Sequence, residues 1–173
     1  MVRAALAQKR MIGRGPKTGA RWIPALTVMA DSLISALPIV SMSGWYPDLA
    51  FLVLIGWRLL RSDPWPAWWA TVLGLFNDLA TGNPIGLSAA LWTATMLALD
   101  LADRRTMWRD YWLEWALAGL LVFLNEAAEW RIAELMSASI PFMTVLPPLL
   151  ISIFAFPIVA WLVGRIDRWR LGR

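Results

Sequence analysis

Long apolar segments alternate with short polar connections along almost the whole chain. A helix needs about 20 mostly apolar residues to cross a bilayer. Measured against that length, the pattern predicts six transmembrane helices, the shorter of which would be tilted or would extend a few residues beyond their apolar runs. The segments are 22–43, 46–60, 65–81, 85–102, 111–130 and 140–164. The predicted fold class is therefore an all-α integral membrane protein, with a single six-helix transmembrane domain over 22–173.

The first and last segments each have an unusual feature. The first could be read as a cleavable signal peptide, but its apolar run is about twice the usual core length. Asp31 and Pro38 also interrupt that run, so we favour a retained span. The last segment contains several prolines, and proline inside a helix removes a backbone hydrogen bond. We therefore expect a kinked helix over 140–164.

Composition supports a membrane protein. The chain is 59% hydrophobic and only 16% charged, whereas soluble domains are about 45–50% apolar and about 25% charged. It also contains 13 Trp residues, and indole rings favour the membrane–water interface. Membrane lipid is thus an expected partner, and nucleic acid is not.

The basic residues predict the orientation. All but one of the 16 Lys and Arg residues lie in 1–21, beside alternate connections, or after residue 164; the exception is Arg131. Alternate connections of a six-span chain share one face, and cytoplasmic loops carry the excess of Lys and Arg. We therefore predict that both termini are cytoplasmic, with a basic tail at 1–21 and a short basic C-terminal tail. The opposite face is expected to be sparse and acidic.

Catalytic chemistry is poorly represented. The chain has no cysteine and no histidine, so thiol nucleophiles, imidazole relays and thiolate metal sites are excluded. A pair of intramembrane acids could act together, but Asp31 and Asp78 occupy different predicted depths. We expect no enzyme activity, no cofactor and no metal.

Small and polar residues recur every fourth position on the third and fourth segments. Residues at that spacing share one helix face, and small side chains let helices approach closely in a membrane. We therefore predict a tightly packed antiparallel pair, or two faces of a common seam. The two stripes are Ala70, Gly74, Asp78 and Gly82 on the third segment, and Gly86, Ala90, Ala94, Ala98 and Ala102 on the fourth.

Asp78 lies in the first of these stripes and should face protein, as intramembrane acids usually do. Gly82 is placed to end its helix in a left-handed conformation, and Pro84 suits the first turn of the next helix. The Asp78 carboxylate could then accept the free N–H groups around residues 85 to 87. A cap on this joint is the preferred interpretation; a substrate or proton site and a partner contact remain open.

Four further polar residues form a candidate intramembrane or partner site: Asp31, Asn125, Glu126 and Glu129. Asp31 is interpreted as a partner in an internal hydrogen bond. Asn125 and Glu129 share a face, and the two glutamates are interpreted as solvated acids near the outer interface. Asp100 is interpreted as an ordinary solvated charge.

The stretch GLFNDLATGNPIGLSAAL at 74–91, together with six spans and cytoplasmic termini, resembles the MreD family of rod-shape-determining membrane proteins. That family has an apolar helix ending G-x-x-x-D-x-x-x-G, followed by x-P-x-G and a helix of small residues. Gly74, Asp78, Gly82, Pro84 and Gly86 match this pattern. The resemblance covers about 22–170, and only the hairpin is motif-like.

The resemblance implies a non-enzymatic scaffold in the bacterial inner membrane that helps control cell shape and lateral peptidoglycan synthesis. Its implied partners are a bitopic MreC-like protein, the MreB filament (directly or through another subunit), a RodA-like glycosyltransferase and its transpeptidase. The family's fold is similar to the substrate-binding subunits of energy-coupling-factor transporters. The alternative function is therefore a small-molecule-binding subunit of a vitamin-type transporter, with a pocket at the outer face.

Overall fold

Six α-helices make up most of the residues that the structure describes. The computed structural model describes residues 22–37, 45–60, 66–103, 111–136 and 141–171. The helices are α2 (Ile23–Ser35), α4 (Leu49–Leu60), α5 (Trp68–Thr81), α6 (Leu87–Asp103), α7 (Tyr111–Leu135) and α8 (Leu146–Leu171). One short 3₁₀ turn, η2 (Phe142–Thr144), precedes α8. Within these ranges there is no strand, so the all-α prediction is confirmed, while the predicted tail at 1–21 lies outside the described residues.

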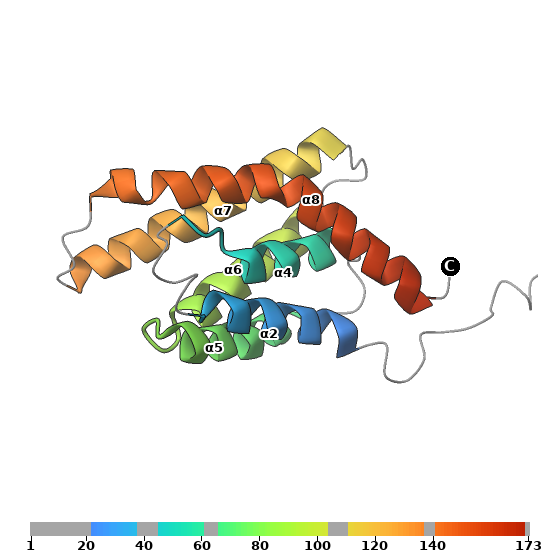
Figure 1. The fold of residues 1–173 in the computed structure, drawn as a ribbon, viewed down its shortest axis with the longest axis horizontal. Coiled ribbons are helices and arrows are strands. Elements are labelled where there is room, and N and C mark those ends of the chain that lie inside the picture. Colours follow the sequence, from blue (N-terminus) through green and yellow to red (C-terminus); the bar gives the residue numbers. More distant parts are fainter. Residues whose placement is uncertain (1–21, 38–44, 61–65, 104–110, 137–140, 172–173) are drawn as a thin grey trace, which may run out of the picture.

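The helices are stacked around α4. Figure 1 shows α7 and α8 along one side of the molecule and α2 and α5 along the other, with α4 and α6 between them. α4 packs on both α2 and α8, and every residue from Ala50 to Leu59 is buried. A helix that is apolar on all sides belongs in a core. α4 is therefore the central helix.

Helix length bears on the expectation of six transmembrane helices, the shorter of which would be tilted. At 12 residues, α4 is about 18 Å long, well short of the hydrocarbon thickness of about 30 Å. Among the described residues, one helical stretch, Phe142–Arg170, is long and apolar enough to cross a membrane. The other helices in these ranges are shorter or more polar than a single span requires.

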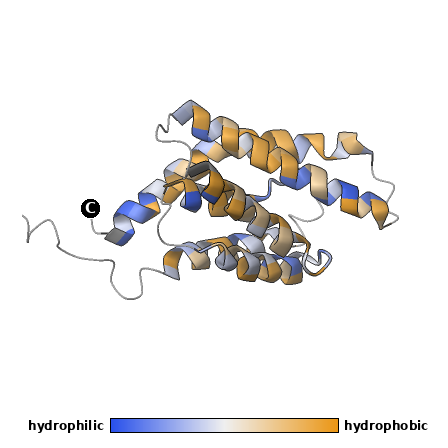
Figure 2. Ribbon diagram, turned by 180° about the vertical axis from the view of Figure 1, so that it is seen from behind, coloured by the Kyte–Doolittle hydropathy of each residue, from blue (hydrophilic) through white to orange (hydrophobic). Residues whose placement is uncertain are grey.

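α8 also ends later than expected. The prediction ended the last segment at residue 164, but α8 continues to Leu171, so Arg168 and Arg170 belong to its last turn. Pro157 lies inside this helix, and α8 changes direction part-way along its length (Figure 1). Proline is the usual cause of such a bend. Figure 2 shows that the end of α8 near the C-terminus is strongly hydrophilic.

Candidate functional site

Asp78 joins the end of α5 to the beginning of α6. Its Oδ2 atom accepts the N–H of Gly86 at 2.8 Å, and its Oδ1 atom accepts the N–H of Ser88 at 2.9 Å. The residue is only 1% exposed. These are the first N–H groups of a helix, which have no partner inside it. Asp78 therefore caps the joint, and the capping bonds expected around residues 85 to 87 are made at Gly86 and Ser88.

The connection depends on two glycines with positive φ. Gly82 ends α5 in the left-handed conformation, with φ 76°, as the sequence predicted. Gly86 has φ 97°, which the sequence did not reveal. α6 begins only at Leu87, so Pro84 lies in the turn and not in the helix, a correction to the expected position. The Pro84 carbonyl accepts the N–H of Leu87 at 3.0 Å.

The two helices approach closely at Gly74. A Cβ atom added there would lie 2.6 Å from both the Cα and the N atom of Ala89, so no side chain fits. Asn77, one turn further along, donates its Nδ2 to the Ser88 hydroxyl at 3.2 Å. The predicted close packing of this hairpin is confirmed, and the seam on α5 uses the expected face.

The prediction that the alanine stripe of α6 packs against α5 is wrong. Ala90, Ala94 and Ala98 are exposed, whereas Ser88 and Ala89 contact α5. Trp92, Met96 and Leu99 are buried, with exposures of 0%, 1% and 2%. These large side chains gain the most from leaving solvent or lipid for a packed core. They set the rotation of α6 about its axis and leave its alanine stripe facing outward.

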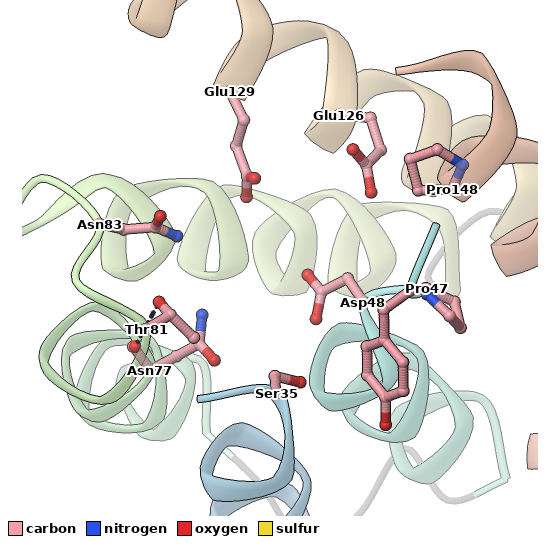
Figure 3. Close-up of a pocket in the computed structure, with 10 residues that line it drawn as sticks. Ser35, Pro47, Asp48, Asn77, Thr81, Asn83, Glu126, Glu129 and Pro148 are labelled. Carbon is pink, nitrogen blue, oxygen red and sulfur yellow. Dashed lines mark hydrogen bonds between the residues drawn. The ribbon is translucent and has the colours of Figure 1, made fainter. Parts of the chain in front are cut away.

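A polar cavity of about 260 Å³ opens beside the hairpin turn. We call it the hairpin-end cavity. Figure 3 shows the carboxylates of Glu126 and Glu129, from α7, directed across it toward that of Asp48. Asn77 and Thr81 form the wall on α5. Its lining residues are Ser35, Tyr46, Pro47, Asp48, Asn77, Thr81, Asn83, Glu126, Glu129 and Pro148.

The acids of this cavity differ in how they are held. Asp48 caps α4, since its Oδ1 accepts the N–H of Phe51 at 3.0 Å, the third helical position, as N-cap side chains do. Glu129 accepts a hydrogen bond from Nδ2 of Asn125 at 2.9 Å, and the two residues share one helix face, as expected. Glu126 has no such bond to a described residue. The lining includes no Lys or Arg, so a cationic guest would be favoured by charge.

The hairpin-end cavity is not organised as a metal centre. Across the described ranges, no three carboxylate side chains come together closely enough to hold a metal ion. A separate hollow of about 230 Å³ shares Asn83, Glu126 and Glu129 with this cavity and is also lined by Trp130. The arrangement suits an extended polar or cationic group better than a bare ion.

The predicted polar set is thus divided in the structure. Glu126 and Glu129 line the hairpin-end cavity, whereas Asn125 lines a separate groove between α6 and α7. The Asp31 carboxylate lines neither space and makes no hydrogen bond with the described residues, so the internal bond expected for it is not found there.

Sequence reasoning missed the wall opposite the glutamates. Asn77, Thr81 and Asn83 stand within four residues of Asp78 or the turn, and polar residues in an apolar helix were an available signal. Ser35 could not have been assigned, because only the packing of α2 against α4 brings it to this cavity.

Asp100 also departs from expectation. It is not an isolated solvated charge, because it pairs with Arg58 of α4, whose side chain is only 4% exposed. This pair ties the end of α4 to the end of α6. Nearby, Arg170 of α8 bonds Asp167 at 2.6 Å and lies 5.3 Å from the ring of Trp57. Basic groups therefore meet at the end of the helices away from the hairpin turn.

No family model, no curated protein and no solved structure matches this chain. The resemblance to the MreD family therefore rests on the hairpin residues and on the arrangement of the apolar segments.

Proposed function

We propose that this chain is a non-enzymatic, multi-pass scaffold of the MreD type in the bacterial inner membrane. The observation that carries the proposal is the hairpin. All five residues of the resemblance lie in or beside one close-packed joint, in which Asp78 caps α6 and Gly74 allows the approach of Ala89. The roles of these residues are structural. The needs of the joint are therefore enough to explain the family pattern, and no catalytic function is required.

The surface supports insertion in a membrane. Large hydrophobic side chains are exposed along several helices, among them Leu79 at 66%, Phe154 at 66% and Ile158 at 69%. Extensive exposed apolar surface on a soluble monomer marks a membrane or partner contact. Because such side chains occur on α5, α7 and α8 alike, lipid is the simplest common environment, and we propose that all six helices lie within the bilayer.

The charges support cytoplasmic termini. Arg58 and Arg170 lie at the end opposite the hairpin turn, while Glu126 and Glu129 lie near the turn. A basic end and an acidic end are what the positive-inside rule expects of an inner-membrane protein with both termini inside. The hairpin-end cavity would then open toward the outer face.

A structural role also accounts for the polar residue most suggestive of chemistry. Both carboxylate oxygens of Asp78 bind backbone N–H groups, which makes the side chain a cap and leaves it poorly placed for acid–base work. We therefore propose that the chain acts by binding partners: an MreC-like bitopic protein, a RodA-like glycosyltransferase with its transpeptidase, and the MreB filament.

Depletion in the source bacterium tests this function. We expect loss of rod shape on depletion and recovery when the wild-type chain is restored. Normal rods after complete depletion, with the cell-wall elongation machinery still active, would refute the proposal.

One observation favours the alternative, a small-molecule-binding subunit similar to those of energy-coupling-factor transporters. The hairpin-end cavity is lined by three carboxylates, two from α7 and one at the start of α4, and has about 260 Å³ of space. Ligand pockets are commonly about 300–1,000 Å³, so the guest would be small and positively charged.

Thermal unfolding with thiamine, a positively charged vitamin, tests the alternative, because a ligand that binds the folded state raises its melting temperature. The alternative predicts a rise that Glu126→Gln removes and that Glu134→Gln, on the exposed end of α7, leaves intact. Riboflavin, a vitamin that lacks the positive charge, is the control ligand and should give no rise in melting temperature. No rise with thiamine would favour the scaffold.

A further inference from the structure

One side of α8 presents exposed residues that change from apolar to basic along the helix. These residues recur at intervals of three or four positions, so they share one helix face. They are Phe154, Ile158, Trp161, Arg165 and Arg168, and all are exposed. The exposures of the three apolar members are 66%, 69% and 59%, respectively. We call this surface the exposed face of α8.

The two arginines of this face lie close together without acidic partners. The guanidinium of Arg165 lies 5.7 Å from the centre of the Trp161 ring. The Nη1 atom of Arg168 would lie 3.6 Å from a Cβ atom added to Gly164, so both side chains turn back toward the apolar part of the helix. Neither forms an ion pair with a carboxylate of the described residues, and Asp167 is buried and bonds a different arginine. Like charges one turn apart repel each other, and an anion would relieve that repulsion.

The length of α8 determines the level at which these arginines lie. Residues 146–164 contain no charged side chain and form about 28 Å of helix, close to the hydrocarbon thickness of about 30 Å. Figure 2 shows the change from hydrophobic to hydrophilic residues toward this end of α8. If α8 crosses the membrane as proposed, Arg165 and Arg168 lie at the level of the lipid phosphates. The indole ring of Trp161 favours the same level.

We propose that the exposed face of α8 binds an anionic phospholipid, whose phosphate contacts Arg165 and Arg168 and whose acyl chain runs along Ile158 and Phe154. Guanidinium groups donate paired N–H groups to phosphate oxygens, and stacking on a ring leaves those groups at the edge accessible. From Phe154 to Arg165 the helix rises about 16 Å, close to one leaflet's half of the hydrocarbon thickness. This inference rests on α8 crossing the membrane, which is part of the proposed function, and not on which proteins the chain binds.

Charge and shape select this occupant over the others that could meet this face. A zwitterionic phospholipid carries a cation next to its phosphate, and Arg165 and Arg168 would repel that cation. A soluble phosphate or an acidic protein segment could contact the two arginines but would leave the apolar part of the face uncovered. A second copy docked symmetrically through the same face would bring like charges together.

Fluorescence quenching by brominated lipids tests the proposal. The chain contains no cysteine, so full-length Ile158→Cys can carry a single bimane fluorophore on the exposed face of α8. The labelled protein is reconstituted in phosphatidylcholine vesicles that contain dibrominated phosphatidylglycerol, which is anionic, or the same fraction of dibrominated phosphatidylcholine, which is zwitterionic. Bromine quenches a fluorophore only at close range, so the two series give the relative affinity of this face for the two lipids.

We expect stronger quenching by the phosphatidylglycerol. Replacing both arginines, as Arg165→Gln with Arg168→Gln, should lower that preference by at least about fivefold, the effect of one cation near an anionic membrane surface. Arg165→Lys with Arg168→Lys keeps both charges and should keep most of the preference. Lys9→Gln with Arg10→Gln is the matched control, because it removes the same charge from the tail at 1–21 and should leave the preference unchanged. Both α8 arginines are exposed, so the melting temperature should stay the same in all these variants.

Equal quenching by the two lipids would overturn the lipid site, as would an equal loss of preference in the tail variant. At constant ionic strength, neither inorganic phosphate nor a soluble glutamate-rich peptide should restore the fluorescence. Recovery with either would assign the arginines to a soluble anion or to an acidic protein segment instead. Quenching by neither lipid would overturn the site together with the membrane insertion of α8. Since the vesicles contain no partner protein, failure of the lipid site is distinguishable from failure of the scaffold function.

Discussion

Gly74 of α5 lies directly against the backbone of Ala89 of α6, with 2.6 Å between a hypothetical Gly74 Cβ and the Ala89 Cα atom. Backbone atoms cannot move aside as the end of a flexible side chain can. The approach of α5 and α6 is therefore possible only with glycine at this position. The same pair of helices carries the Asp78 cap, so one hairpin combines a close backbone approach with two buried hydrogen bonds to a carboxylate.

Gly74→Ala should destabilise the protein by at least about 2 kcal/mol, because overpacking a tight contact forces backbone shifts. Gly119→Ala is the control. Its added Cβ would lie 3.7 Å from a methyl group of Ile153, an ordinary contact, and Ala is the better helix former. Thermal unfolding of the two purified variants in detergent should show loss of stability for the first only. Equal stability would contradict the close approach.

Asp78→Asn should lower the free energy of unfolding by about 2 kcal/mol, and Asp78→Ala by about twice as much. The two carboxylate oxygens accept separate N–H groups. An amide can accept one of them and turns a donor toward the other, so Asn replaces the carboxylate only in part. Unfolding measurements on both variants should rank the wild type as most stable, Asp78→Asn next and Asp78→Ala last. An Asn variant as stable as wild type would contradict the two-bond cap.

Gly86→Ala should cost about 1–3 kcal/mol, the usual range for a residue held in a sparsely populated backbone conformation. Gly82→Asn should cost much less, because Asn tolerates the left-handed conformation that Gly82 adopts at φ 76°. Neither position has an atom within 4 Å of an added Cβ, so steric overlap of that atom does not account for the cost at Gly86. If the two variants unfold at the same temperature, the positive φ of Gly86 is not a constraint.

Single cysteines can test the proposed orientation, again because the chain has none of its own. Thr144 and Trp169 are both exposed and lie near opposite ends of α8. In intact spheroplasts an impermeant maleimide should label Thr144→Cys and should label Trp169→Cys only after lysis. The reverse pattern would place the termini outside.

The sequence predicted the hairpin well because its chemistry is local. Asp78 and Gly82 lie four positions apart, and helix-capping preferences act over that distance. The rotation of α6 about its axis was not predicted. The four-residue spacing of small side chains shows that they share one face of the helix, but not which neighbouring helix packs against that face. Trp92 and Met96 took the core position, and the alanines were left outside.

The hairpin-end cavity was predicted only in part for a related reason. Glu126 and Glu129 were identified because acids are conspicuous in an apolar segment. Ser35 and Asp48 join them through contacts between helices distant in sequence. Asp100 was misinterpreted in the same way, since its partner Arg58 lies on another helix.

Affinity purification from membranes of the source organism tests most directly the proposal that this chain is a scaffold of the elongation machinery. The wild-type chain, tagged and solubilised in mild detergent, should retrieve an MreC-like bitopic protein and a RodA-like glycosyltransferase. Gly119→Ala should retrieve them equally well, and Gly74→Ala less well at equal abundance. Retrieval of neither protein by the folded wild-type chain would contradict the account.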